Sequence, residues 1–216
     1  MEKGKTFVVV VDGECVHYGN DVVGRNEIRC ATQAEGVKKA LESITEEDVR
    51  VVVAASRGIS VEDLFTADRR VGGAYVSDTA YLCALSRDVQ SGLVVSFECG
   101  VLRVVPVVQS HVLRCYEENT KGPIDEESVL RGIVRVLNRL GREESVALSE
   151  NILFRGMEGI DTEKTLGFIK MVRKDIPVFR REVPGHLRYD HDLFDCALHV
   201  ARFVFTSAAL YHHRQY

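Results

Sequence analysis

Apolar runs and polar breaks alternate along this chain in an order that occurs twice. The first half opens with three short runs, and Asp12-Gly13 joins the first two, a dipeptide typical of two-residue hairpin turns. These runs predict a meander of three strands. Apolar residues at helical spacing then alternate with further strand-like runs. The expected strands of the meander are residues 6–11, 14–18 and about 26–30, and the later elements are a helix at 33–44, a strand at 49–56, a helix at 60–67, a strand at 72–76 and a helix at 77–86.

The second half repeats this order. It opens with GLVVSFECGVLRVVPVV, in which a short polar break separates two apolar runs and predicts a strand pair. The expected strands are 93–97, 101–108 and 111–116, followed by a polar stretch at 117–128, a helix at 127–140, a strand at the end of 146–156, a helix at 162–173, a strand at 177–183 and a helix from about 190 onward. The repeat predicts two α/β lobes, residues 1–88 and 89–216, and leaves open whether the final helix packs back on the first lobe.

Composition narrows the class of protein. The 216 residues are 45% hydrophobic and 28% charged, which is typical of a globular protein. A net charge of −4 gives no long-range attraction for nucleic acid, so we expect no direct nucleic-acid partner. The late apolar stretch at 197–210 is interrupted by His199 and Arg202, and no membrane span is expected. The six cysteines occur singly, which favours reduced thiols and an intracellular location.

Three segments carry a resemblance to a known protein family. GGAYVSDTAYLCALSRDVQSGLVVSFECGVLRVVPVV is similar to the actin segment that carries a strand, a helix, the second phosphate loop and a trailing Val-Pro. ALSENILFRGMEGI is similar to the actin strand and adenine-side loop, and RYDHDLF…YHHRQY resembles the C-terminal helices. The resemblance as a whole, including the order of strands and helices, covers most of the chain. The resemblance implies an α/β fold of two ribonuclease-H-like lobes of actin type. The outer insertion subdomains would be missing, because residues 20–30 and 117–128 are too short to hold them.

The departures from actin fall on the nucleotide site that the resemblance implies. In register with the second phosphate loop, Asp-x-Gly-Asp-Gly, this chain has Ser96-Phe97-Glu98-Cys99-Gly100. Both aspartates are therefore replaced, and the negative charge of Glu98 stands where a glycine would let backbone amides approach phosphate. These losses predict that metal and phosphate contacts are gone from this loop.

The other two loops are altered as well. In the first loop Asp12 and Gly13 remain, but Glu14-Cys15 follow in place of a hydroxyl and a glycine. The adenine-side double glycine becomes Arg155-Gly156. We therefore expect no catalysis and no bound cofactor, with Mg-ATP binding as the alternative. The vestigial nucleotide-binding residues are Asp12, Gly13, Gly100 and Gly156.

Each of the other candidate metal-binding or catalytic residues can also be explained by a structural role. Asp12 and Glu98 could share a magnesium ion, although an Asp-Gly turn explains Asp12 as well. His191, Asp195 and His199 share a helix face, but ligands spread over two turns rarely converge on one metal. The terminal pair His212-His213 is a weaker metal candidate. Cys99 has no evident histidine partner in the sequence, so a small turn residue is favoured over a nucleophile. We expect no metal site.

Protein partners are expected instead. The polar stretch at 117–128 is either a solvated loop or a docking loop. Apolar residues cover more than one face of the last helix, which suits core packing or partner contact through Phe203, Phe205 and Tyr211. The resemblance implies a structural subunit of a chromatin-remodelling or acetyltransferase complex, or of dynactin. The frequency of such subunits favours the nucleus. The alternative is a minimal ATPase or small-molecule kinase of the actin, heat-shock ATPase and sugar kinase superfamily.

Overall fold

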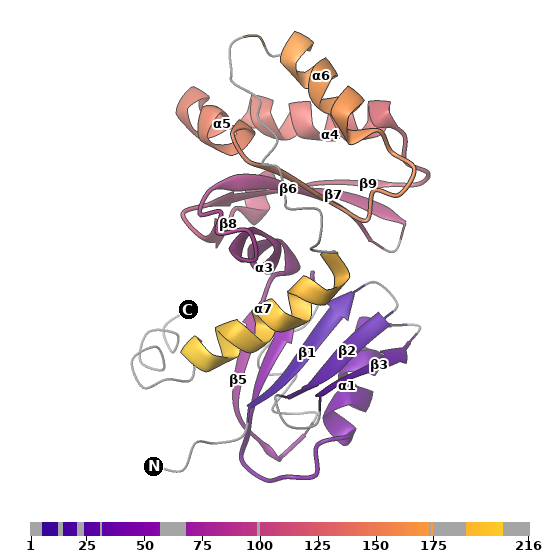
Figure 1. The fold of residues 1–216 in the computed structure, drawn as a ribbon, viewed down its shortest axis with the longest axis vertical. Coiled ribbons are helices and arrows are strands. Elements are labelled where there is room, and N and C mark those ends of the chain that lie inside the picture. Colours follow the sequence, from indigo (N-terminus) through magenta and orange to yellow (C-terminus); the bar gives the residue numbers. More distant parts are fainter. Residues whose placement is uncertain are drawn as a thin grey trace. The chain divides into compact units, whose positions relative to one another are not determined.

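The computed structural model shows an α/β fold with two mixed five-stranded sheets (Figure 1). It describes residues 6–12, 15–20, 24–30, 32–56, 68–98, 100–172, 174 and 189–204. The chain divides into two compact units, residues 1–82 with 190–216 and residues 83–189. The division falls within helix α3 (Thr79–Leu85), and helix α7 (Tyr189–Val204) belongs to the first unit.

The first sheet has the strand order β3-β2-β1-β4-β5. Strands β1, β2 and β3 form an antiparallel meander, whereas β4 and β5 run parallel to β1. The central strands are apolar because both of their faces are covered, as expected for parallel strands at the middle of a sheet. The bounds are β1 (Thr6–Asp12), β2 (Cys15–Asn20), β3 (Gly24–Arg29), β4 (Val49–Ala54) and β5 (Val71–Ser77), which confirms the expected strands.

Helices cover both faces of the first sheet. Helix α1 (Gln33–Glu42) packs Val37, Ala40 and Leu41 into a core with the β1 residues Phe7, Val9 and Val11 and their neighbours. Helix α7 lies on the opposite face, where Arg25 of β3 stacks 5.8 Å from the centroid of the Phe194 ring (Figure 1).

Both ends of α1 are satisfied by side chains. The Thr32 hydroxyl accepts a hydrogen bond from the Glu35 backbone N–H at 3.2 Å, which caps the helix N-terminus. Beyond the other end, Arg70 donates to the carbonyls of Leu41 and Ile44. Asp68 forms an ion pair with Arg70, and the guanidinium lowers the pKa of the Asp68 carboxyl below its ordinary value. The cation thus fixes the loop before β5 to the C-terminus of α1.

The second sheet has the order β10-β6-β7-β8, with β9 also paired to β7. Helices α4, α5 and α6 bury one of its faces, and the core joins Leu93, Val95 and Leu102 of the strands to Ile133 and Leu166 of the helices. The bounds are β6 (Gly92–Glu98), β7 (Val101–Val108), β8 (His111–Val112), β9 (Glu118–Lys121), α4 (Glu126–Arg139), α5 (Arg142–Ser149), β10 (Ile152–Arg155) and α6 (Thr162–Val172).

The end of the second meander differs from its prediction. Only His111 and Val112 of the expected strand at 111–116 form a strand, and Arg114–Tyr116 form a 3₁₀ turn. The longer pairing on this side of β7 is made by β9, which lies in the stretch expected to be a polar loop. Glu118 of β9 accepts ion pairs from Arg135 and Arg139 of α4, both at 2.9 Å. The polar strand is thus held by its pairing with β7, and its Glu118 carboxylate is matched by two arginines of the adjacent helix.

Helix α5 is an element that the apolar pattern did not predict. It is only eight residues long and has a weak apolar face. The buried Ser145 hydroxyl donates to the Leu137 carbonyl of α4 at 2.7 Å, and Leu148 is buried in the core of the second unit. Contacts with α4 and the sheet therefore hold a helix that its own sequence specifies poorly.

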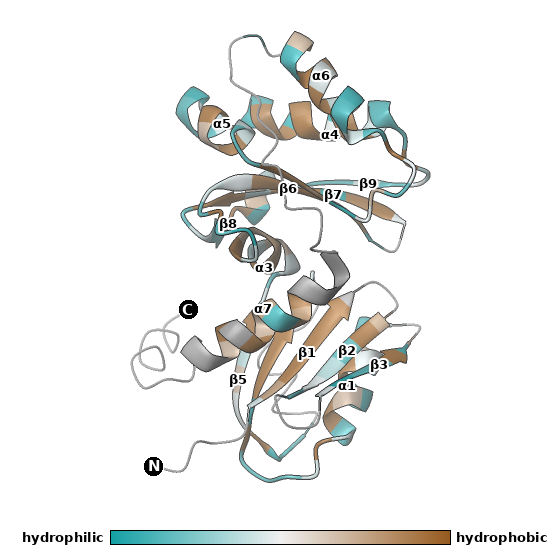
Figure 2. Cartoon of the chain, in the orientation of Figure 1, coloured by the Kyte–Doolittle hydropathy of each residue, from teal (hydrophilic) through white to brown (hydrophobic). Residues whose placement is uncertain are grey.

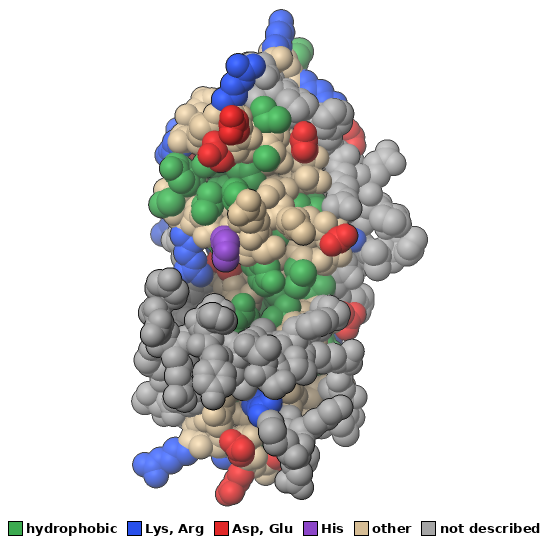
Figure 3. All heavy atoms as spheres, turned by 90° about the vertical axis from the view of Figure 1, so that its left-hand side faces the viewer, with side chains coloured by type: hydrophobic (Ala, Val, Ile, Leu, Met, Phe, Trp, Pro, Cys, Tyr) green, Lys and Arg blue, Asp and Glu red, His purple; other side chains and the backbone are tan. Residues whose placement is uncertain are grey.

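The predicted helix at 60–67 and strand at 177–183 lie outside the described residues. Within the described part, no helix is long and apolar enough to cross a bilayer. Figure 2 shows that the central strands are the most hydrophobic elements, whereas β9 is hydrophilic. On the face drawn in Figure 3, hydrophobic side chains lie among acidic and basic ones.

Candidate functional site

Two hairpins occupy the positions that the resemblance assigns to the phosphate loops. In each, the paired end residues enclose a two-residue loop: Asp12 pairs with Cys15, and Glu98 pairs with Val101. Asp12 ends β1, but its side chain and Gly13 lie outside what the structure describes. The two hairpins belong to different units.

Gly100 and Gly156, the two candidate nucleotide-binding glycines of the second unit, lie at the same end of its sheet. Gly100 has a φ of 71°, a conformation that favours glycine, and its backbone carbonyl accepts a hydrogen bond from Gly122 at 3.2 Å. Gly156 follows β10 with a φ of 62°, and a Cβ built there would lie 2.6 Å from the Phe97 carbonyl oxygen. Gly156 therefore allows the chain leaving β10 to pass close against the end of β6.

A buried ion pair stands at this end of the sheet. The Arg155 Nη1 atom lies 2.5 Å from the Glu98 Oε1 atom, and the two side chains are 5% and 7% exposed. The resemblance places Glu98 in a phosphate loop and Arg155 in an adenine-side loop, and the structure brings these two residues together. The Glu98 carboxylate faces a cation of the protein itself. A metal ion or phosphate that entered here would have to compete with that pair.

A second buried pair lies on the same face. Arg103 Nε is 3.1 Å from Glu117 Oε1, with the side chains 5% and 4% exposed. Ser96 is directly opposite Arg103 on one side and Arg155 on the other, so these three residues form a row across β7, β6 and β10. We name this row the charged row: Arg155, Ser96 and Arg103, with Glu98 and Glu117 as its carboxylates. It lies on the face opposite the core formed with α4 and α6, because its members alternate with core residues along each strand.

The charged row was missed from the sequence, although a signal for it exists. Arg103 interrupts the apolar strand β7 between the buried Leu102 and Val104, whereas Ser96 follows a run of buried apolar residues in β6 and Arg155 ends β10 after the buried Phe154. A polar residue between buried positions predicts either an edge or a buried polar partner. Choosing the partner requires the strand register, which the sequence does not supply.

The Cys15 thiol, which stands at the altered first loop, has little nucleophilic character. Burial and then the nearby Glu27 carboxylate raise the pKa of the Cys15 thiol above its ordinary value. The thiol therefore stays protonated near neutral pH, and a protonated thiol is a poor nucleophile. Cys99, the other cysteine in a loop position, lies outside the described residues.

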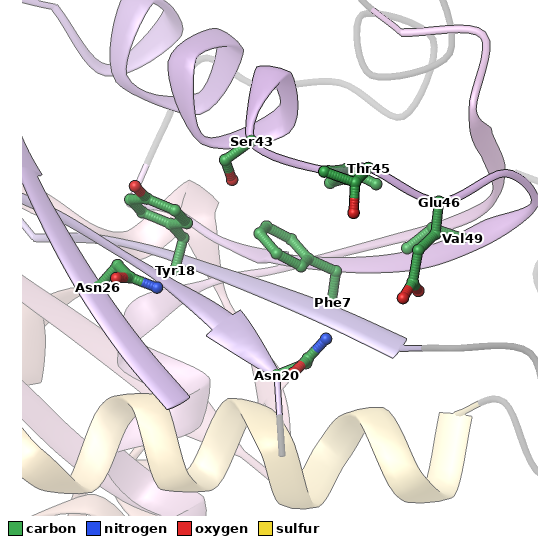
Figure 4. Close-up of a pocket in the computed structure, with 9 residues that line it drawn as sticks. Phe7, Tyr18, Asn20, Asn26, Ser43, Thr45, Glu46 and Val49 are labelled. Atoms are coloured by element: carbon green, nitrogen blue, oxygen red, sulfur yellow. The ribbon is translucent and has the colours of Figure 1, made fainter. Parts of the chain in front are cut away.

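The first unit contains a pocket that the sequence did not reveal (Figure 4). It has a volume of about 230 Å³ and lies at the end of the sheet where β1 begins, opposite to the end that carries Asp12. Figure 4 shows the rings of Phe7 and Tyr18 side by side beneath Ser43 and Thr45. The described lining residues are Phe7, Tyr18, Asn20, Asn26, Ser43, Ile44, Thr45, Glu46 and Val49. They come from separate segments, so no linear motif marks the pocket.

The structure describes the remaining candidate residues, those for partner and metal binding near the C-terminus, only in part. Phe203 is in α7, but nothing is described of its side chain, and Phe205 and Tyr211 lie beyond the described residues, as do His212 and His213. His191, Asp195 and His199 are all in α7, and the side chains of both histidines are outside the description. Within the part of the chain that is described, no three His, Cys, Asp or Glu side chains are grouped to hold a metal.

Comparison with known proteins identifies no family for this chain. No protein-family model matches it, and no curated protein matches its sequence.

Proposed function

We propose that this chain is a non-catalytic, actin-related structural subunit of a larger intracellular complex. The observation that carries the proposal is the buried Glu98–Arg155 pair. It stands at the turn where the resemblance places the second phosphate loop. A phosphate-binding turn needs open backbone amides and uncompensated positive charge. Here the turn begins with a carboxylate that is held by an arginine.

The order of the strands supports the two-lobe part of the proposal. The sequence β3-β2-β1-β4 in the first sheet matches β9-β7-β6-β10 in the second, with the same antiparallel and parallel pairings. The covering helices α1 and α4 also pack on equivalent faces. A duplicated lobe is what the actin superfamily leads one to expect, and this agreement concerns fold rather than activity.

The loss of nucleotide contacts supports a structural role over an enzymatic one. Charge-assisted hydrogen bonds contribute about 1.5–3 kcal/mol each, so losing three of them would weaken nucleotide binding by several powers of ten. A subunit that binds no nucleotide loses the stabilisation that a ligand gives, and contacts with protein partners would supply it instead. Nuclear chromatin-remodelling or acetyltransferase complexes are the favoured setting, and dynactin is the cytoplasmic one.

One observation favours the alternative of a minimal ATPase or small-molecule kinase. Gly100 and Gly156 keep the positive φ angles that let a backbone approach a ligand closely. In that alternative Asp12 and Gly13 of the first loop would complete the site.

Calorimetric titration with Mg-ATP tests the two functions against each other. We expect no binding in the micromolar range and no phosphate release. A variant with Ser96→Asp, Glu98→Gly and Cys99→Asp restores the actin-type loop pattern and provides the matched comparison. Micromolar binding by the wild-type chain, or measurable hydrolysis, would support the enzyme instead.

Affinity purification from native cells tests the partner requirement. The wild-type chain should co-purify with other subunits in a constant ratio. Substituting Phe203, Phe205 and Tyr211 with Glu should abolish the co-purification of those subunits. Met171→Glu is the control, because Met171 is an exposed apolar residue of α6 in the other unit, 59% accessible. Recovery of the wild-type chain as a stable monomer without partners would contradict the structural role.

A further inference from the structure

The first sheet has two edge strands of different character. Strand β3 carries Arg25, Glu27 and Arg29, and charged side chains on an edge discourage pairing with another chain. Strand β5 forms the opposite edge, and its seven residues, VGGAYVS, include no charged residue and no proline (Figure 1). Within the described residues, no strand pairs with the outer side of β5. An edge that nothing in its own sequence blocks is a template for the addition of another strand.

The described edge strands of the second sheet differ from β5. Strand β9 carries Glu118 and Lys121, β10 is four residues long and ends in the buried Arg155, and β8 has only two residues. Charge or short length therefore limits pairing at each of them. Among the edge strands that the structure describes, β5 is the longest and has the least to prevent pairing.

The backbone direction of β5 determines which of its residues can pair outward. The Ser77 carbonyl accepts a hydrogen bond from the Ala55 N–H at 3.0 Å, so Ser77 directs its backbone groups toward the β4 side. The direction alternates from one residue to the next, and Tyr75 therefore faces the same side as Ser77. Ala74 and Val76 direct their N–H and C=O groups to the outer side. Both residues are of intermediate exposure.

The side chains beside these backbone groups suit an uncharged strand. Ala74 and Val76 pack against the core under α1, and Tyr75 lies between them on the other face of the sheet. A charged residue on an added strand would lose contact with water here, and β5 would offer it no opposite charge. The sequence of β5 itself meets this requirement. The strand is thus complementary to a second copy of itself.

We propose that β5 pairs with β5 of a second copy of this chain, antiparallel and about a twofold axis at Tyr75. In this register Ala74 of each copy lies opposite Val76 of the other, and each such pair exchanges two backbone hydrogen bonds. The two Tyr75 side chains become cross-strand neighbours on one face, which stabilises the pairing. The interface does not rest on the proposed function, because it uses none of the residues assigned to partner binding.

The register follows from the extent of the regular strand. A twofold axis at Ala74 would place Val76 opposite Gly72, where the pairing of β5 with β4 shifts register. An axis at Val76 would place Ala74 opposite Asp78, which lies beyond the end of β5. Only the axis at Tyr75 gives both outward-facing residues a partner within the regular part of the strand.

Sedimentation velocity of the full-length chain over a range of concentrations tests the pairing. We expect a reversible monomer–dimer equilibrium with a dissociation constant in the micromolar range, because residues 73–77 cover less surface than the roughly 800 Å² per partner of a standard interface. Tyr75→Lys sets two like charges opposite each other and should weaken dimerisation about tenfold or more. Asn26→Lys is the control, because it adds the same charge to an exposed position of the other edge strand, β3. A chain that is monomeric at every concentration, or equal effects of the two variants, would overturn the proposal while the proposed subunit function stands.

Disulfide cross-linking tests the register and does not depend on a destabilising variant. Opposed residues of a non-hydrogen-bonded antiparallel pair have Cα atoms about 4.5 Å apart, which a disulfide can span. Tyr75→Cys should therefore give a covalent dimer on mild oxidation. Ala74→Cys is the matched control, because the two Ala74 residues are not opposite each other in this register. Oxidised wild-type chain gives the background from native thiols such as the exposed Cys115. Cross-linking of Ala74→Cys in preference to Tyr75→Cys, or of the wild type to the same extent, would overturn the pairing.

Discussion

The two sheets of this protein share the same order and pairing of their central strands but carry different side chains at equivalent positions. Each is built around a hairpin that encloses two loop residues, so Val10 of β1 corresponds in position to Ser96 of β6. In the first sheet Val10 lies between His17 and Ala54. In the second, Ser96 lies between Arg103 and Arg155. The equivalent row of positions therefore holds one polar side chain, His17, in the first sheet, whereas in the second sheet it is the charged row.

The difference shows that the strand order does not depend on an apolar row. In the first sheet the only polar side chain of the row, His17, has its Nδ1 atom 3.2 Å from the Nε atom of Arg25 in β3. In the second sheet two arginines are buried, and each is matched by a carboxylate. Removing charges from water is costly, and a buried pair offsets that cost only when both partners are present. The second sheet should consequently be the more sensitive to single substitutions.

The largest expected effect comes from breaking the charged row. Arg155→Met leaves the Glu98 carboxylate buried without its guanidinium, and we expect a loss of about 3–5 kcal/mol in the free energy of unfolding, measured by urea denaturation. The double variant Glu98→Leu, Arg155→Met should recover wild-type stability or exceed it. If Arg155→Met costs less than about 1 kcal/mol, the pair is not buried in solution.

A second comparison uses equivalent core leucines under the two covering helices. Leu41 of α1 and Leu137 of α4 are each 1% exposed, and truncation to Ala should cost about 2–5 kcal/mol in either case. We expect Leu41→Ala to accelerate amide hydrogen exchange mainly in the first sheet and Leu137→Ala mainly in the second. Equal acceleration in both sheets by either variant would show that the two units open together.

Glycine substitutions give a smaller effect that separates two causes. Gly100→Ala should cost about 1–2 kcal/mol from its left-handed backbone alone, since nothing lies within 4 Å of a Cβ there. Gly156→Ala carries the same backbone cost and also brings a Cβ against the Phe97 carbonyl, so its melting temperature should fall further. A smaller loss for Gly156→Ala than for Gly100→Ala would mean that the two loops are not packed as described.

The smallest effect concerns the caps of the two covering helices. The Ser128 backbone N–H donates to the Asp125 carboxylate at the start of α4, and this bond lowers the pKa of Asp125 below its ordinary value. Because the folded pKa is depressed, the stabilisation is present above the unfolded value of about 3.9 and is lost as the pH falls through the folded value.

Comparison of the wild type with Asp125→Ser measures this contribution. The difference in melting temperature should be largest near pH 7 and shrink below about pH 4. Thr32→Ser at the start of α1 is the control, because neither hydroxyl titrates in this range. A constant difference for Asp125→Ser across the pH range would show that the cap is not ionised in the folded protein.

Local patterns were enough for the elements that bury their own apolar residues. The β-branched runs of β1 and β4 and the amphipathic spacing of α4 each reflect short-range geometry, and the structure confirms these elements. The first hairpin also forms, but Asp12, which was expected in its turn, belongs to β1 and pairs with Cys15. The repeated order of strands and helices could be predicted from the sequence for the same reason. Nothing in those patterns required knowledge of a distant segment.

The sites required the tertiary structure, because their partners are distant in the chain. Glu98 and Arg155 are 57 positions apart, and the resemblance placed both at one site without indicating that their side chains form an ion pair. Strand β9 is polar, and it pairs with β7 while Glu118 forms ion pairs with Arg135 and Arg139 of α4. The pocket exists because α1 ends before the sheet beneath it does. The pairing of charged side chains and the shape of a pocket depend on strand register and on packing between elements. A single sequence determines the local preference for helix, strand or turn, but it does not show which distant residues come into contact.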